Sequence, residues 1–226
     1  MTNNTSAVHS RDRSMLTVFI KELDRIWFGV AYTENKIAAT AINTTKEGVI
    51  KSLTRSIPSY AEYRIRNESS GFAEKIILML RELNLGNEDF KSFSLAGECI
   101  SEPAASVLKA AASVPIGYVT SYGNLAKIAG TSPRAVGRIM AKNPIYPIVP
   151  CHRIVGSNFS LVGYGGRKTS QALQAKLAKL LKERRGFNSK KKISADGGQL
   201  TVYPVERVIS KAEKELLNSH QQKKLN

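Results

Sequence analysis

The stretch around which this chain is organised runs Asn143-Pro144-Ile145-Tyr146-Pro147-Ile148-Val149-Pro150-Cys151-His152-Arg153-Ile154-Val155. It is an apolar run punctuated by prolines, and it places a cysteine directly beside a histidine. A thiol is a good nucleophile only as the thiolate, and its ordinary pKa of about 8.5 leaves most of it protonated at neutral pH. A histidine that accepts the proton, on a rigid loop, supplies that activation. For an isolated Cys-His dipeptide, a cysteine buried as a small hydrophobic residue is the better interpretation.

Length and composition indicate a globular protein of one or two domains. The chain has 226 residues, of which 42% are hydrophobic and 23% charged. No apolar run reaches membrane-spanning length, and the N-terminal residues lack the apolar segment of a signal peptide. Two cysteines make no disulfide framework. We therefore expect no membrane association and a cytoplasmic protein, or a nuclear one if the source is eukaryotic.

The net charge of +16 points to a polyanionic partner. Nucleic acid is the first candidate and an anionic membrane surface the second. A basic tail can also supply such a charge, so composition alone does not decide the partner.

The first hundred residues read as a small α/β scaffold with no catalytic cluster. Residues 1–13 are polar and aperiodic, and we expect them to be disordered. From residue 14, β-branched and aromatic runs predict three strands in hairpin succession, at 16–20, 26–32 and 37–42. Helical periodicity follows over 45–55 and 72–83. We place this domain at 14–100.

Two short helices joined by a glycine turn precede the Cys-His stretch. A helix begins at Ser101-Glu102-Pro103 and runs to about Ser113. Residues 121–129 then predict a short helix ending at Gly130, and residues 134–142 a second, basic one that stops at Asn143-Pro144. The pair is a helix-turn-helix candidate, and the alternative is an ordinary αα-hairpin. The net charge favours the first.

Three further segments follow the Cys-His stretch. Residues 163–166, Gly-Tyr-Gly-Gly, form a close-approach loop of the kind that walls a pocket. Residues 169–185 predict a packing helix that has leucines at helical spacing and lysines between them. Beyond Phe187 we expect a basic extension, 187–226, with linkers at 189–192 and 196–198 and a terminal helix over 205–218.

Taken together, these motifs resemble the O6-alkylguanine-DNA alkyltransferases. The resemblance rests on Pro150-Cys151-His152-Arg153 after Asn143-Pro144, and in the same order on Ser121-Tyr122-Gly123, on residues 132–137 and on residues 163–166. It covers about 101–166 closely and reaches about 186 more loosely. It implies an α+β fold, in which an RNase H-like N-terminal domain with an antiparallel hairpin sheet precedes a mostly helical, winged helix-turn-helix-type domain at 101–186.

The resemblance also implies a reaction. Cys151 would take the alkyl group from O6 of guanine in DNA, or from O4 of thymine, in a single turnover that consumes the protein. His152 would be the general base, and Tyr122 would rotate the target phosphate and protonate the leaving guanine. Glu183 is the candidate for the glutamate that orients the histidine, although Arg184-Arg185 stand where the family pattern has an acid followed by glycine.

DNA binding and base recognition complete what the resemblance implies. Arg134 would intercalate through the minor groove after base flipping, with Ser132, Ala135, Gly137 and Tyr122 also at the DNA. Asn143 would join the second helix to the Cys loop, and it is also a plausible helix stop. The guanine pocket would be formed by Met140, Asn143, Ile154, Val162, Tyr164 and Gly165.

Several motifs are absent from the sequence, and their absence narrows the expected function. Two cysteines with His9, His152 and His220 cannot compose a four-cysteine zinc site, so we expect no metal, and Cys99 is expected to be a buried hydrophobic residue. The sequence contains neither a phosphate-binding glycine loop nor an acidic metal cluster, so we expect no cofactor. The partner would be double-stranded DNA, bound by a monomer. The alternatives are a non-catalytic alkyltransferase-like damage sensor, against which Cys151 argues, and a Cys-His hydrolase, which would explain neither the helix pair nor the charge.

Overall fold

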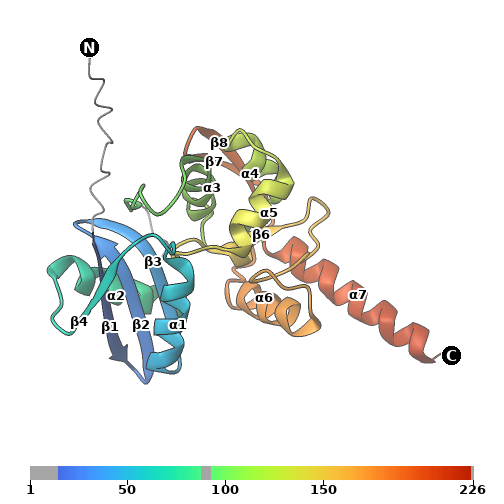
Figure 1. Cartoon of the computed structure of the whole chain (residues 1–226). Helices are drawn as coiled ribbons and strands as arrows, with labels where there is room; N and C mark the ends of the chain where they lie inside the picture. The colour runs from blue at the N-terminus through green and yellow to red at the C-terminus, as the bar shows by residue number, and fades with distance from the viewer. Residues whose placement is uncertain (1–14, 88–92, 225–226) are drawn as a thin grey trace, which may run out of the picture.

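The computed structural model describes residues 15–87 and 93–224, with side chains described as far as residue 215 (Figure 1). The segment 1–13, for which we predicted disorder, lies outside the described residues. The three predicted strands and the helices at 46–56, 71–85 and 102–112 are present with ends within one or two residues of the expected ones, except that the first strand runs three residues further, to Leu23.

The N-terminal half is a four-stranded sheet in the order β3-β2-β1-β4. Its strands are β1 (Leu16–Leu23), β2 (Ile26–Thr33), β3 (Lys36–Asn43) and β4 (Tyr63–Arg66). The first three are antiparallel, and β4 pairs parallel to β1. Asp24 and Arg25 have φ values of 52° and 63°, which is the left-handed pair of a two-residue hairpin turn.

Two helices cover the opposite faces of this sheet, α1 (Lys46–Ser56) and α2 (Gly71–Leu85). Residues of β1 alternate between them, since Val18 packs with Val49 and Leu53 of α1 whereas Phe19 packs with the buried residues of α2. Helix α1 crosses so close to β2 that a Cβ at Gly29 would lie 2.4 Å from Val49 Cγ1.

The second half begins with a helix, a short strand and the helix pair. The elements are α3 (Glu102–Ala112), β5 (Tyr118–Ser121), α4 (Tyr122–Ile128), α5 (Pro133–Ala141), the 3₁₀ turn η1 (Cys151–Arg153), β6 (Ile154–Val155) and α6 (Ser170–Lys182). Serines cap both helices of the pair, because the hydroxyl of Ser121 accepts from Asn124 N and that of Ser132 accepts from Ala135 N. The predicted boundaries of α3, α4 and α5 are correct to within one residue, whereas α6 ends three residues before the predicted end at 185.

The linkers expected at 189–192 and 196–198 are wrong. The structure has a hairpin there, β7 (Lys191–Ala195) and β8 (Gly198–Pro204), followed by α7 (Glu206–Lys224). The hairpin joins the second sheet, whose order is β6-β5-β8-β7. Leu200 and Val202 enter the main core, and this burial outweighs the solvation of the neighbouring lysines.

The two halves share one core, and the Cys-His stretch is fixed against the first sheet. Thr40 on β3 donates its backbone N–H to Pro144 O and its hydroxyl to Tyr146 O, each at 2.8 Å. Ile145 and Ile148 are buried in the cluster that contains Phe28, Val30 and the inner face of α2. The loop that carries Cys151 is therefore held by a rigid sheet. In the described part of the chain, no helix is long and apolar enough to cross a membrane.

Candidate active site

Cys151 opens the 3₁₀ turn after Pro150 and lines a cavity of about 590 Å³. This volume falls within the usual range of small-molecule pockets. Burial raises the pKa of the thiol, while a contact with the Asn143 side chain and the charges of Lys176 and Lys179 act in the opposite direction. The thiol is thus kept protonated at rest and needs a base.

The loop leading to Cys151 is tied by Asn143. Its Nδ2 donates to Val149 O at 2.8 Å, and its Oδ1 accepts from Ile145 N at 3.1 Å. The first bond spans the apolar run between the end of α5 and the thiol, and the second closes a turn at the start of that run. Asn143 therefore couples the second helix of the pair to the Cys loop, one residue after the helix C-cap at Lys142.

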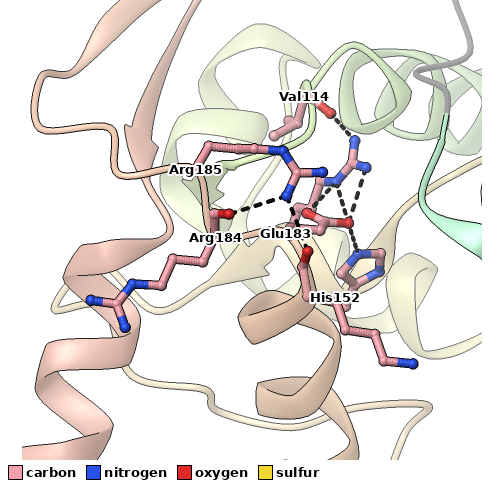
Figure 2. A network of polar contacts seen from close by, with 7 residues as sticks. Val114, His152, Glu183, Arg184 and Arg185 are labelled. Carbon is pink, nitrogen blue, oxygen red and sulfur yellow. Dashed lines mark hydrogen bonds and ion pairs between the residues drawn. The ribbon is translucent and has the colours of Figure 1, made fainter.

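Next to Cys151 in the sequence, His152 contacts Glu183 in a buried polar network (Figure 2), and Arg153 joins this network by hydrogen bonds. Glu183 Oε1 lies 2.7 Å from His152 Nε2. Arg153 Nε donates to Glu183 Oε2 at 2.9 Å, and its Nη1 donates to Val114 O at 2.5 Å. The structure thus brings Glu183, at the C-terminal end of α6, against the histidine despite the arginines that follow it.

This geometry fixes the tautomer of the histidine. A carboxylate only accepts, so Nε2 carries the hydrogen and Nδ1 has the lone pair. Nδ1 is buried and has no hydrogen-bond partner among the residues that the structure describes. It is therefore the nitrogen that can accept a proton.

The charges agree with this assignment. Burial lowers the pKa of His152, against the opposing effect of Glu183, so the imidazole is neutral. Burial alone would raise the pKa of Glu183, but the hydrogen bond to His152 and the charge of Arg153 outweigh it and hold the pKa at about 2. A neutral base is thus oriented by an ionised carboxylate.

One wall of the cavity comes from α4 and α5. Tyr122, Arg134, Gly137 and Met140 line it, and the Arg134 side chain is exposed at its edge. Burial raises the pKa of Tyr122 to about 12, with the nearby Cys151 as a second cause. The phenol therefore keeps its proton at neutral pH and can donate it.

The opposite wall is the loop 162–168, which includes Val162, Tyr164 and Gly165. Val162 has a φ of 59°, a backbone conformation that is costly for a β-branched residue. Burial raises the pKa of Tyr164 above its usual value, as does its hydrogen bond with Tyr146. The wall thus contains one residue with a strained backbone, Val162, and one phenol that keeps its proton, Tyr164.

Several of the predicted residues do not line the cavity. His152 and Glu183 lie behind it, and Asn143 supports the loop. Ser132 caps α5, Ala135 follows it on the same helix, and Ile154 is fully buried with its carbonyl bound to a lysine.

Two residues of the site escaped the sequence analysis, Arg153 and Lys176. Lys176 is fully buried, and its ammonium donates to the carbonyls of Ile154, Leu161 and Gly163 at 2.5, 2.8 and 3.1 Å. Its Nζ also lies 5.9 Å from the centre of the Tyr122 ring. Burial lowers its pKa to about 8, and Cys151 opposes that effect. One signal was available, since Lys176 stands at helical spacing between Leu173 and Leu180 on the buried stripe.

Replacing Lys176 with methionine should destabilise the protein by about 3–5 kcal/mol, because three buried carbonyls lose the charged group that they bind. Urea unfolding measures this. The exposed Lys182→Met on the same helix is the matched control and should stay within about 0.5 kcal/mol of the parent. Equal effects of the two substitutions would contradict the role of Lys176 as an anchor of the loop.

Groups of three or more His, Cys, Asp or Glu side chains suited to a metal ion are absent from the described residues.

A known family model matches much of the second half of the chain. Residues 102–185 match the family model of the 6-O-methylguanine DNA methyltransferase DNA-binding domain. This match agrees with the resemblance seen in the sequence. The match ends before the hairpin and α7.

Two named relatives also match parts of this chain. A methylated-DNA–protein-cysteine methyltransferase of Pyrobaculum aerophilum is 58% identical over 53 residues, which cover 24% of this chain and 36% of the relative. One of Methanocaldococcus jannaschii is 29% identical over 145 residues, 64% of this chain and 83% of the relative. The first-ranked curated relatives are matched over less than half of their length.

Solved structures show the same fold. The O6-methylguanine-DNA methyltransferase of Pyrococcus kodakaraensis is 27% identical, with a TM-score of 0.50 over 75% of this chain and 99% of that one. Mycobacterium tuberculosis OGT in complex with DNA is 23% identical, with a TM-score of 0.52 over 74% of this chain and 92% of that one. The α+β architecture with two small sheets is therefore that of known O6-methylguanine methyltransferases.

Proposed function

We propose that this protein repairs DNA by moving the alkyl group from O6 of guanine, or from O4 of thymine, to Cys151. The observation that carries the proposal is the Cys151 thiol at a cavity of about 590 Å³, backed by Glu183 and by His152, whose Nδ1 is unpaired among the described residues. The transfer is stoichiometric, since the S-alkylcysteine has no route back to the thiol. Titration with alkylated duplex should therefore saturate at one group per protein molecule. Continued turnover would contradict the proposal.

The proton and the electron pair have defined destinations. The Cys151 thiol gives its proton towards His152 Nδ1, directly or through a water, and Sγ attacks the alkyl carbon. The C–O6 bond breaks and its electron pair stays with guanine. Tyr122, whose hydroxyl is protonated, donates to the developing negative charge on the base. No cofactor takes part in these steps.

We assign DNA binding to the module α3-β5-α4-α5-β7-β8, read as a winged helix-turn-helix. Strand order β5-β8-β7 places the hairpin on the strand that leads into α4. Asn124 Nδ2 donates to Thr201 O at 3.3 Å, which fixes the hairpin to the helix pair. A Cβ at Gly197 in its turn would lie 3.4 Å from Ile128 O at the end of α4. The partner is double-stranded DNA, and the protein acts as a cytoplasmic monomer.

For the N-terminal half we propose the RNase H-like architecture that the resemblance implies. The order β3-β2-β1-β4, with three antiparallel strands and a parallel edge strand, supports it, as do helices on both faces. Its role is to hold the Cys loop through Thr40.

Replacing Arg134 with alanine should slow repair of a paired target by about tenfold or more, and repair of a single-stranded target much less. The flipped base leaves a gap in the stack, and refilling it offsets an unstacking cost of a few kcal/mol. Single-turnover rates on both substrates measure this. The exposed Lys127→Ala on α4, outside the cavity, is the control and should leave the ratio of the two rates unchanged. An equal loss of rate on both substrates would contradict the intercalation role of Arg134.

The sensor alternative is not favoured. It needs a non-nucleophilic residue at position 151, whereas the chain has a cysteine whose neighbour is positioned as a base. The hydrolase alternative gains no support from the family match.

A further inference from the structure

The pocket loop 156–163 carries two strained residues and needs support from outside. Phe159 and Val162 have φ values of 64° and 59°, which non-glycine residues adopt at a cost. Within the loop, Gly156 N donates to Ser160 O at 2.8 Å and Phe159 N donates to Gly156 O at 2.9 Å. These local bonds hold the turn, but they do not fix its position relative to the cavity.

That support comes from the C-terminal segment, defined here as residues 187–215. The Phe159 ring meets the Tyr203 ring edge-on, at 5.2 Å between centres. The guanidinium of Arg207 lies 5.4 Å from the centre of each ring. Arg207 on α7 therefore holds together an aromatic pair that joins β8 to the pocket loop.

The same segment contributes to a small apolar core that also contains Val119, Val155 and Leu180. Leu161 and Phe159 pack against a buried cluster that contains Val205, Val208 and Ile209. On its other side, the loop backbone is bound by Lys176 through the carbonyls of Leu161 and Gly163. Val162 lies between these attachments and lines the cavity. Its position is thus set by groups on both sides, one of them in the C-terminal segment.

We propose that the C-terminal segment, through Tyr203 and Arg207, positions the pocket loop and with it the wall residue Val162, and so sets which alkyl groups the pocket accepts. Tyr203 and Arg207 are positioning residues, since neither lines the cavity. The family match ends at residue 185, so this support lies outside the matched domain. The inference rests on the proposed alkyl transfer.

The test compares two substrates, the free base O6-benzylguanine and O6-methylguanine in duplex DNA. Arg207→Ala should raise the benzyl-to-methyl ratio of transfer rates about fivefold, because the wall relaxes outwards and admits the larger group. A difference of one methylene group in a hydrophobic pocket already changes selectivity by about 10-fold or more. Phe159→Ala should give the same change, and the double variant should add little, because both remove one contact. Arg207→Lys keeps the cation and should restore most of the parental ratio.

Glu213→Ala, an exposed site on the same helix, is the matched control and should leave the ratio unchanged. A parental ratio in Arg207→Ala, with or without a lower melting temperature, would overturn the proposal and leave the segment a purely structural role. A fall in the ratio, or additive effects of the two substitutions, would overturn it as well. If the parent transfers neither group, the failure lies in the proposed function and not in this inference.

Discussion

Replacing Cys151 with serine should abolish alkyl transfer, with a loss of at least about 10⁴-fold, as expected when the nucleophile of a covalent mechanism is removed. A hydroxyl ionises far less readily than a thiol, and His152 is a neutral base suited to a thiol proton. Single-turnover transfer from duplex O6-methylguanine measures the loss.

The controls separate chemistry from binding. Cys99→Ser changes the second, half-buried cysteine and should retain transfer at close to the parental rate. The Cys151→Ser protein should still bind duplex DNA with parental affinity and salt dependence, since the basic surface is unchanged. Transfer by Cys151→Ser, or its loss in Cys99→Ser, would place the acceptor elsewhere.

Replacing Glu183 with glutamine should slow transfer by about 10²- to 10³-fold. The carboxylate holds the His152 ring and keeps hydrogen on Nε2, and loss of the equivalent acid in other triads misplaces the tautomer. The substitution also breaks the buried ion pair with Arg153, which costs about 3–5 kcal/mol. Stability and transfer rate are measured separately, at a temperature at which the variant is folded.

The Glu183 carboxylate should also shape the acid stability of the protein. Its pKa in the folded state is about 2, below the ordinary value near 4.5, so the folded state favours the ionised form. The stabilisation is therefore complete above about pH 4.5 and is lost as the pH falls towards 2. Urea unfolding over this range should show a steeper loss in the parent than in Glu183→Gln. The exposed Glu213→Gln should follow the parent. Parallel curves for the parent and Glu183→Gln would contradict the role of the buried carboxylate.

The sequence predicted much of the site because local chemistry marks it. A cysteine beside a histidine, serines at two helix starts and a glycine-rich loop each have a local physical reason, and their order points to one family. The three N-terminal strands were equally readable, since β-branched runs alternate with turns. The short edge strand β4 was missed because it has only four residues, the lower limit for a period-2 signal, and all four are exposed.

What escaped prediction depends on tertiary burial. The lysine run before Ile193 resembles a solvated linker, yet Leu200 and Val202 on the next strand reach the core. Lys176 looks like one more surface lysine of α6, but the loop carbonyls that it binds come from residues 13 to 22 positions earlier. The partnership of Glu183 with His152 likewise depends on where α6 ends in space.

Peptide mass after a single incubation tests the central claim most directly. The protein is mixed with duplex DNA containing one O6-methylguanine, digested, and the peptide carrying Cys151 is weighed and fragmented. The account predicts one methyl group in place of the thiol hydrogen on Cys151, at up to one per protein molecule, with unmodified guanine restored in the DNA. An unmodified Cys151 peptide beside repaired DNA, or a methyl group on another residue, would contradict it.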